Sequence, residues 1–412
     1  MLRSMFAGVS GLRSHQMMMD VVGNNIANVN TTGFKSSRVT FQDTLSQLQT
    51  GGAGGSAQSG GINPQQVGLG VRVGAIDAVN TQGAIQTTGR STDAAIQGEG
   101  YFVVRSGAEQ LYTRAGAFGF DDSGHLTDPS GYIVQGYLAD AGGTIDVNGP
   151  LQDITLPLGQ AIPPRATTTV NAGGNLSSTA TTPVVNSIEI YDALGASHTV
   201  SITYTPGEPA GDGSRSWDVS VAEKGSGDVL GTGTISFGPD GRRDATTGDI
   251  TFARPGSGAG TVTLDLGAPG AATALTQYGG STSAGALGQD GSETGYLSSF
   301  AISNDGTVSG IFSNGASKPL GQLALATFAN PGGLVKEGDN HMRADNNSGI
   351  AQIGTPGAVG KGSLAAGSLE MSNVDLAQEF TNLIIAQRGF QANSRIISAS
   401  DELLQDLVNL KR

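Results

Sequence analysis

Hydrophobic residues recur every seven positions at the two ends of the chain. The first repeat contains Met5, Leu12, Met19 and Ile26, with Leu2 close before it. The second repeat, near the end, consists of Leu369, Leu376, Leu383, Phe390, Ile397 and Leu404. A seven-residue apolar repeat lines one stripe of a helix and is typical of helices that pack along their length. We therefore predict one helix at each end, the two pairing as a coiled coil.

The predicted packing stripe is made of ten residues. They are Leu2, Met5, Leu12, Met19, Ile26, Leu376, Leu383, Phe390, Ile397 and Leu404. Ser372, with Asp375 three residues on, indicates where the second helix begins, because the acid can cap free backbone N–H groups there.

Between the ends, the apolar period changes from seven to two, which indicates strands. One set of short strands includes Tyr101–Arg105 and Ile133–Tyr137, and a second set includes Ser216–Ala222, where Trp217 is expected to anchor a core. Strands of the first kind resume at Gly295–Ile302. This order predicts a mainly β, multidomain protein with nested β domains, the second inserted in the first.

The predicted organisation has four parts. They are a terminal helical domain (1–30 with 372–412), an extended connector (31–70 with 357–371), an inner β domain (71–150 with 290–356) and an inserted outer β domain (151–289).

Composition narrows the functional classes. The 412 residues carry a formal net charge of −13, which disfavours a nucleic-acid partner, since phosphate backbones attract clustered Lys and Arg. The chain has no Cys, so disulfides and thiolate chemistry are excluded. No apolar run approaches the roughly 18–20 residues of a membrane-spanning helix, and no cleaved secretory signal is expected at the start.

A search for catalytic or metal-binding patterns finds little. The sequence has no complete nucleotide-binding or nucleophile-elbow motif, and its four histidines lack metal-ligand spacing. Two acidic, glycine-containing turns, 121–124 and 345–349, lack the terminal Glu of a calcium loop. We therefore expect no cofactor and no metal, and these patterns give no support for enzymatic activity.

The segment 24–35 is unusual because it places four short amides at the end of a helix. Asparagine side chains compete with the helical backbone, and the following Thr-Thr-Gly favours a helix stop with an apolar anchor beyond it. The residues of this motif are Asn24, Asn25, Asn28, Thr31, Thr32, Gly33 and Phe34.

This motif closely resembles the N-terminal signature of the bacterial flagellar axial proteins, a family of rod, hook and hook-associated proteins. The stretches 372–377 and 387–393 resemble the partner signature at the other end of that family, and 63–70, 82–90 and 96–102 resemble its shared β domain. Within the family, the large insertion at 151–289 favours a hook-type member.

The resemblance implies a structural role. Hook-type chains assemble into a curved hollow tube, outside the cell and attached to the basal body, that joins rod to filament as a universal joint and transmits motor torque. The implied partners are copies of the same chain, the rod, hook-cap and hook–filament junction proteins, and the type III export apparatus with its chaperones. Export without a cleaved signal is implied, as is a protein that is not embedded in a membrane.

Three alternatives stay open from the sequence. Within the family, the chain could be a distal-rod-like protein with an enlarged insertion. From other classes, it could be a secreted β-rich adhesin or a carbohydrate-active enzyme.

Overall fold

Two long helices and thirty-one strands make up the described chain. The structure, a computed structural model, describes residues 2–52, 54, 55, 60–140, 142–157, 159 and 161–409. The side chain of Leu2, and parts of the predicted terminal, connector and β segments, lie outside these residues. The chain forms two compact units, unit 1 (1–156, 300–309 and 319–412) and unit 2 (157–299 and 310–318).

The element bounds, in chain order, open with helix α1 and the strands that follow it. They are α1 (Leu2–Ala27), β1 (Ser37–Asp43), β2 (Ser46–Thr50), β3 (Gln65–Gly68), β4 (Val71–Ala78), β5 (Ile85–Thr87), β6 (Ala94–Gln97), β7 (Tyr101–Ser106), β8 (Glu109–Thr113), β9 (Gly119–Phe120), β10 (Leu126–Thr127), β11 (Ile133–Leu138) and β12 (Gln152–Asp153).

The strands of the middle of the chain follow. They are β13 (Ala161–Ile162), β14 (Thr169–Asn175), β15 (Val184–Tyr191), β16 (Ser197–Pro206), β17 (Arg215–Glu223), β18 (Val229–Phe237), β19 (Ile250–Ala253), β20 (Thr261–Asp265), β21 (Leu275–Thr276) and β22 (Gly285–Gln289).

The last elements lead into the second long helix. They are β23 (Gly295–Ile302), β24 (Thr307–Phe312), β25 (Ser317–Leu323), β26 (Leu325–Thr327), a 3₁₀ turn η1 (Pro331–Gly333), β27 (Val335–Gly338), β28 (His341–Arg343), β29 (Gln352–Gly354), β30 (Ser363–Ala366), β31 (Ser368–Glu370) and α2 (Leu376–Asn409).

Unit 1 contains a sheet whose strand β7 is covered by apolar side chains on both faces. Its central strands lie in the order β25-β11-β7-β8-β28-β27. Strand β7 is buried on both faces: Tyr101 and Val103 pack in one apolar cluster, while Phe102 stacks edge-on against Phe118 with ring centroids 5.0 Å apart. A strand buried on both sides explains why 101–105 reads as a nearly continuous apolar run.

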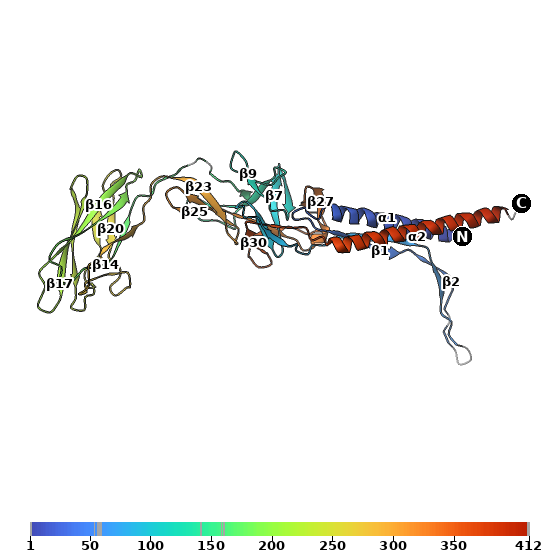
Figure 1. Cartoon of the computed structure of the whole chain (residues 1–412), viewed down its shortest axis with the longest axis horizontal. Coiled ribbons are helices and arrows are strands. Elements are labelled where there is room, and N and C mark those ends of the chain that lie inside the picture. Colours follow the sequence, from blue (N-terminus) through green and yellow to red (C-terminus); the bar gives the residue numbers. More distant parts are fainter. Residues whose placement is uncertain are drawn as a thin grey trace. The chain divides into compact units, whose positions relative to one another are not determined.

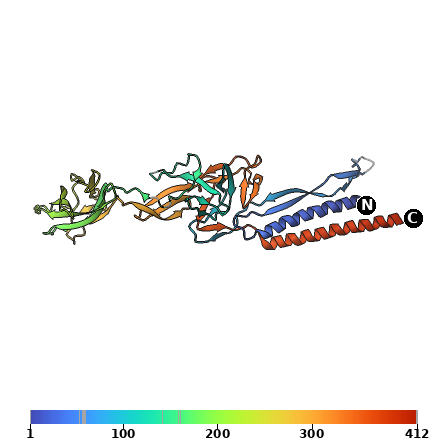
Figure 2. The same ribbon diagram turned by 90° about the horizontal axis from the view of Figure 1, so that it is seen from above.

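The first and last parts of the chain meet in unit 1. Strand β5 pairs with β31 and β6 pairs with β30, all antiparallel. Strands β1 and β4 also pair and pack along α1, as Figure 2 shows. Figure 1 shows α1 (blue) and α2 (red) side by side, with the chain termini at the same end.

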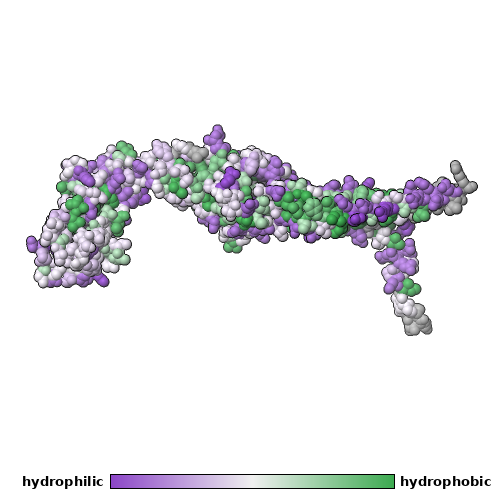
Figure 3. All heavy atoms as spheres, viewed as in Figure 1, coloured by the Kyte–Doolittle hydropathy of each residue, from purple (hydrophilic) through white to green (hydrophobic). Residues whose placement is uncertain are grey.

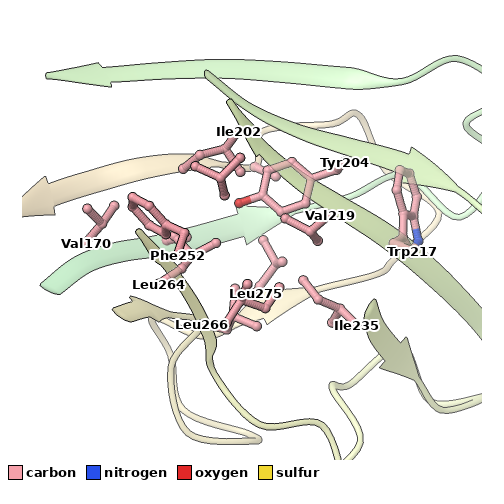
Figure 4. Close-up of a cluster of buried hydrophobic side chains, with 14 of the residues drawn as sticks. Val170, Ile202, Tyr204, Trp217, Val219, Ile235, Phe252, Leu264, Leu266 and Leu275 are labelled. Atoms are coloured by element: carbon pink, nitrogen blue, oxygen red, sulfur yellow. The ribbon is translucent and has the colours of Figure 1, made fainter. Parts of the chain in front are cut away.

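Unit 2 is a two-sheet β structure around one core. One sheet has the order β15-β16-β17-β18, and the other has β19-β20-β14-β21 with β22 added on β14. Along β17 the side chains alternate, so Trp217 and Val219 point inward and are fully buried. Figure 4 shows both side chains in one buried cluster that also contains Phe252 and Leu264 from the second sheet. Trp217 is the core anchor that its sequence context predicts.

The predicted fold class is confirmed. The protein is mainly β, its terminal helices pair, and unit 2 is inserted between segments of unit 1. The finer four-part division stays a prediction.

One detail of the second helix differs from the sequence-based expectation, and its cap agrees with it. Leu369, the first member of the apolar repeat, lies in β31 and pairs with Gln86, because the backbone stays extended up to Glu370. The cap is the predicted acid: Asp375 Oδ1 accepts hydrogen bonds from the N–H groups of Ala377 (2.9 Å) and Gln378 (3.2 Å).

Candidate functional site

The two terminal helices pair antiparallel through a seam of small residues. Gly8 faces Ile397, Gly11 faces Asn393, and Gly389 faces His15. A Cβ atom built on Gly389 would lie 2.4 Å from Cε1 of His15, and one on Gly11 would lie 2.8 Å from the Asn393 amide. The close approach of α1 and α2 therefore depends on glycine, as at other helix contacts where small residues let backbones come together.

Among the ten predicted packing residues, Ile397 lies in this seam, where it faces Gly8. Eight of them are half-buried: Met5, Leu12, Met19, Ile26, Leu383, Phe390, Ile397 and Leu404. Leu376 is exposed, and nothing is described of the Leu2 side chain. Because a single chain leaves most of this stripe half open, its role in packing between subunits stays a prediction.

Helix α2 also exposes large apolar side chains on both sides of the seam. Leu376, Phe380 and Ile384 are four residues apart and share one face, while Ile385, Ile396 and Leu403 share another, because spacings of eleven and seven return to nearly the same side of a helix. Their exposed fractions range from 40% (Leu376) to 57% (Ile384). We call these six residues the α2 apolar faces. Figure 3 shows apolar surface, in green, where the helical part adjoins the sheets of unit 1.

The asparagine-rich motif forms the end of α1 and its attachment to the strands. Asn28 Nδ2 donates to the backbone oxygen of Asn24 (3.0 Å) and to its side-chain Oδ1 (2.8 Å), and Thr31 Oγ1 donates to Asn28 Oδ1 (3.0 Å). Asn25 is buried, and its amide binds both the N–H and the C=O of Ser37 at the start of β1. The motif therefore caps the helix and fixes the strand that leaves it.

Asn25 also reaches α2. Its Nδ2 donates to Glu379 Oε1 at 3.2 Å, one turn inside that helix. Burial raises the pKa of Glu379, and the hydrogen bond from Asn25 partly offsets this effect. One amide thus joins α1, β1 and α2.

The last motif residues pack on the strands of unit 1. Gly33 has φ = +70°, its N–H donates to the Glu370 oxygen (2.7 Å), and a Cβ there would lie 2.6 Å from the Ala115 nitrogen. Only glycine fits this position. The oxygen of Thr32 accepts from Asn340 Nδ2 (3.2 Å), and the Phe34 ring lies 5.1 Å from the Lys336 amine.

A buried ion cluster, which the sequence does not reveal, lies directly behind the motif. The fully buried carboxylate of Glu370 binds Lys35 Nζ (2.5 Å) and Arg114 Nη1 (3.3 Å). It also accepts from the N–H of Gly83 (2.8 Å). Lys35 Nζ donates further to the Thr81 oxygen (2.8 Å). Burial lowers the pKa of Lys35, and its hydrogen bond with Glu370 opposes that change. We call Lys35, Arg114 and Glu370 the junction cluster.

The junction cluster ties four segments that are remote in sequence: the motif, the β4–β5 connection, the end of β8, and β31. Lys35 and Glu370 are 335 positions apart. The one hint in the sequence is that Lys35 directly follows Phe34 in the motif; no spacing pattern points to Arg114 or Glu370.

Among the residues that the structure describes, no group of His, Cys, Asp and Glu is arranged to hold a metal ion. In the same part of the chain, no helix is long and apolar enough to cross a membrane.

Comparisons with known proteins place this architecture in a class. Four family models match: "Flagella basal body rod protein" at 5–35, "Flagellar hook protein FlgE/F/G D1 domain" at 95–178, "Flagellar basal body protein FlaE D2 domain" at 163–292, and "Flagellar basal body rod FlgEFG protein C-terminal" at 365–410. The fold and its terminal helix pair are thus those of the flagellar axial proteins.

Individual relatives narrow the class. The chain is 42% identical to the flagellar hook protein FlgE of Treponema pallidum over the whole length of both proteins. It is 33% identical to the basal-body rod protein FlgG of Bacillus subtilis, again over both full lengths. A crystal structure of the Helicobacter pylori hook protein FlgE2 superposes with a TM-score of 0.53 at 14% identity, covering 69% of this chain and all of that one, which shows a shared fold.

The chain belongs to the flagellar hook protein family. The resemblance found in its terminal motifs is confirmed, and the higher identity to a hook protein favours a hook subunit over a rod-like protein. Membership places the chain in a structural, homopolymeric axial assembly of the flagellum, at the hook.

Proposed function

We propose that this chain is the repeating subunit of a curved hollow tube, the flagellar hook, which acts as a universal joint carrying motor torque to the filament. The observation that carries the proposal is the pair of α2 apolar faces. These six side chains stay 40–57% exposed in the single chain, although Ile396 also borders the helix seam at Gly8. Neighbouring copies would bury them.

The energetics favour such packing. Burying one large aliphatic or aromatic side chain contributes roughly 1.5–3 kcal/mol. Six partly exposed residues per subunit, repeated along a helical polymer, supply a stiff apolar wall of paired helices. The exposed strands of the β units, in contrast, are rich in small polar residues, and contacts between such surfaces change at low cost, which suits bending.

The remaining parts of the proposal follow from the family. The subunit would be exported through the flagellar type III apparatus without a cleaved signal, assisted by chaperones. It would then contact the rod, the hook cap and the hook–filament junction proteins. Its role would be structural rather than enzymatic.

Polymerisation of an α2 variant tests the proposal. Ile385→Asp places a charge on an exposed apolar face, so the monomer keeps its fold while burial between copies becomes unfavourable. We expect the critical concentration for polymerisation to rise by about 100-fold, equivalent to about 3 kcal/mol. Sedimentation measures the polymer, and circular dichroism checks the monomer.

Gln387→Asp is the matched control, because Gln387 is exposed on the same helix and polar already. It should polymerise normally. Normal tubes from Ile385→Asp would refute the α2 faces as subunit contacts. Electron microscopy of the native polymer addresses the alternative within the family: straight rods instead of curved tubes would favour a rod-like protein.

A further inference from the structure

Unit 2 has a polar surface cavity that no part of the proposed assembly role requires. Its volume is about 380 Å³. This lies within the range of roughly 300–1,000 Å³ typical of ligand pockets and far exceeds the ~30 Å³ that one water occupies. The residues that matter for its chemistry are Asn175, Arg242, Arg243, Thr276, Tyr278 and Ser283.

The backbone of Arg242 is held by hydrogen bonds, while its guanidinium is exposed to solvent. Its backbone N–H donates to Asp240 Oδ1 (3.2 Å), its oxygen accepts from Gly238 (2.9 Å), and it bridges to Thr276. Its Nη groups form no hydrogen bond with any described residue. Asp240 lies 3.9 Å from Nε, but both side chains are 63% exposed, so water screens this pair and it contributes little.

The neighbouring residue, Arg243, pairs with the carboxylate of Asp249. It is buried, and its Nη1 binds Asp249 Oδ1 at 3.2 Å while its Nη2 donates to the Gly267 oxygen. Arg243 Nε is buried without a hydrogen-bond partner among the described residues. None of the described residues that line the cavity is acidic. The cavity is therefore a positive site in a unit whose acids outnumber its bases.

Neutral polar side chains line the same cavity as the two arginines. Ser283 Oγ accepts from the Asn175 N–H (3.2 Å), which leaves its own hydroxyl proton to donate. The Tyr278 ring packs against the Gly241 turn, since a Cβ there would lie 2.7 Å from Cδ1, and the hydroxyl makes no hydrogen bond with the described chain. A guanidinium with flanking hydroxyls fits a ligand that carries one carboxylate and several hydroxyl groups.

We propose that unit 2 binds a carboxylate-bearing sugar, of the hexuronic acid class, in this cavity. The Arg242 guanidinium takes the carboxylate through two parallel N–H···O bonds, and the Ser283 and Tyr278 hydroxyls bind sugar hydroxyls. The size of the cavity favours a sugar acid over an inorganic anion.

The protein has a built-in reporter for this site. Trp217, the chain's one tryptophan, donates from Nε1 to Gln277 Oε1 at 3.2 Å. Gln277 lies between the cavity residues Thr276 and Tyr278, and its N–H donates to the Gly241 oxygen (2.8 Å), next to Arg242. Occupation of the cavity should therefore change Trp217 emission.

The test is a titration of the full-length monomer with glucuronate, followed by Trp217 fluorescence and by calorimetry, with glucose and sulfate as separate titrants. We expect saturable glucuronate binding that is at least tenfold tighter than binding of either glucose or sulfate. Arg242→Gln should weaken glucuronate binding by about tenfold or more, because it removes a charge-assisted bidentate contact.

Arg165→Gln is the matched control in the same unit, since Arg165 is a 70% exposed arginine paired with Asp290 outside the cavity. It should bind glucuronate as the native chain does. Absence of glucuronate binding, or unchanged affinity in Arg242→Gln, would overturn the site. Equal affinity for sulfate would overturn the sugar acid as its ligand.

Discussion

Glu370 makes most of the contacts in the junction cluster. Its side chain binds Lys35, Arg114 and the Gly83 N–H, and its backbone oxygen accepts from Gly33. The buried side chains of Lys35 and Arg114 share this one carboxylate. Such a cluster gives little net stability against an apolar replacement, but removing its one acid leaves two buried positive charges.

Glu370→Gln should therefore destabilise unit 1 strongly. We expect a loss of about 3–5 kcal/mol in the free energy of unfolding, because Lys35 and Arg114 lose their counter-charge inside the protein. Urea unfolding followed at 222 nm reports the change, since both long helices belong to unit 1.

Glu337→Gln is the surface counterpart of this change. Glu337 pairs with Arg343 at 2.5 Å, but both side chains are more than 40% exposed, so its loss should cost less than about 1 kcal/mol. Similar effects of the two substitutions would contradict the importance of the junction cluster.

At the scale of the elements, the seam between α1 and α2 depends on residues that are poor helix formers. Glycine costs roughly 0.5–1 kcal/mol relative to alanine inside a helix. Gly8, Gly11 and Gly389 are kept at the contact, where their missing Cβ atoms let the backbones approach, whereas Gly23 in α1 has open space around it. Glycine therefore stabilises the helix pair at the seam and destabilises α1 at position 23.

Alanine substitutions separate these two situations. Gly389→Ala should destabilise the helix pair by about 1–2 kcal/mol, because its Cβ would collide with the His15 ring, which in turn packs edge-on at 5.6 Å from Phe41. Gly23→Ala should stabilise it by about 0.5–1 kcal/mol. Thermal unfolding at 222 nm measures both, and a stabilising Gly389→Ala would show that the helices are not held this closely.

The elements themselves were largely predictable, and their contacts were not. Period-two alternation located 216–222 in β17 and put Trp217 inside, because a half-buried strand imposes that pattern directly. The prediction that Leu369 belongs to the helical repeat was wrong, because seven-residue spacing alone does not show where a strand ends and a helix begins. The seam and the junction cluster escaped the sequence because they join residues such as 11 with 393 and 35 with 370, a proximity that only the folded chain creates.

At the scale of the whole molecule, each unit has a core of its own. Unit 2 packs Trp217, Val219 and Leu264 into one cluster, while Leu325 in β26 is fully buried in unit 1. The one tryptophan lies in unit 2 and the long helices lie in unit 1, so the two units have separate spectroscopic signals.

Cavity-forming substitutions should affect one signal at a time. Leu264→Ala should lower the free energy of unfolding reported by Trp217 fluorescence by about 2–5 kcal/mol and leave the 222 nm transition of the helices in place. Leu325→Ala should lower the free energy of unfolding reported at 222 nm and leave the Trp217 fluorescence transition in place. A common shift of both transitions by either variant would show that the units unfold as one cooperative body.

The pairing of β5 with β31 and of β6 with β30 also has a consequence for timing. Strands β5 and β6 pair only with strands at residues 363–370, so neither of these two-stranded sheets can form until those residues are available. Closing such a long loop is entropically costly and slow. The topology therefore delays folding: unit 1 is completed only after residues 363–370 have become available to β5 and β6.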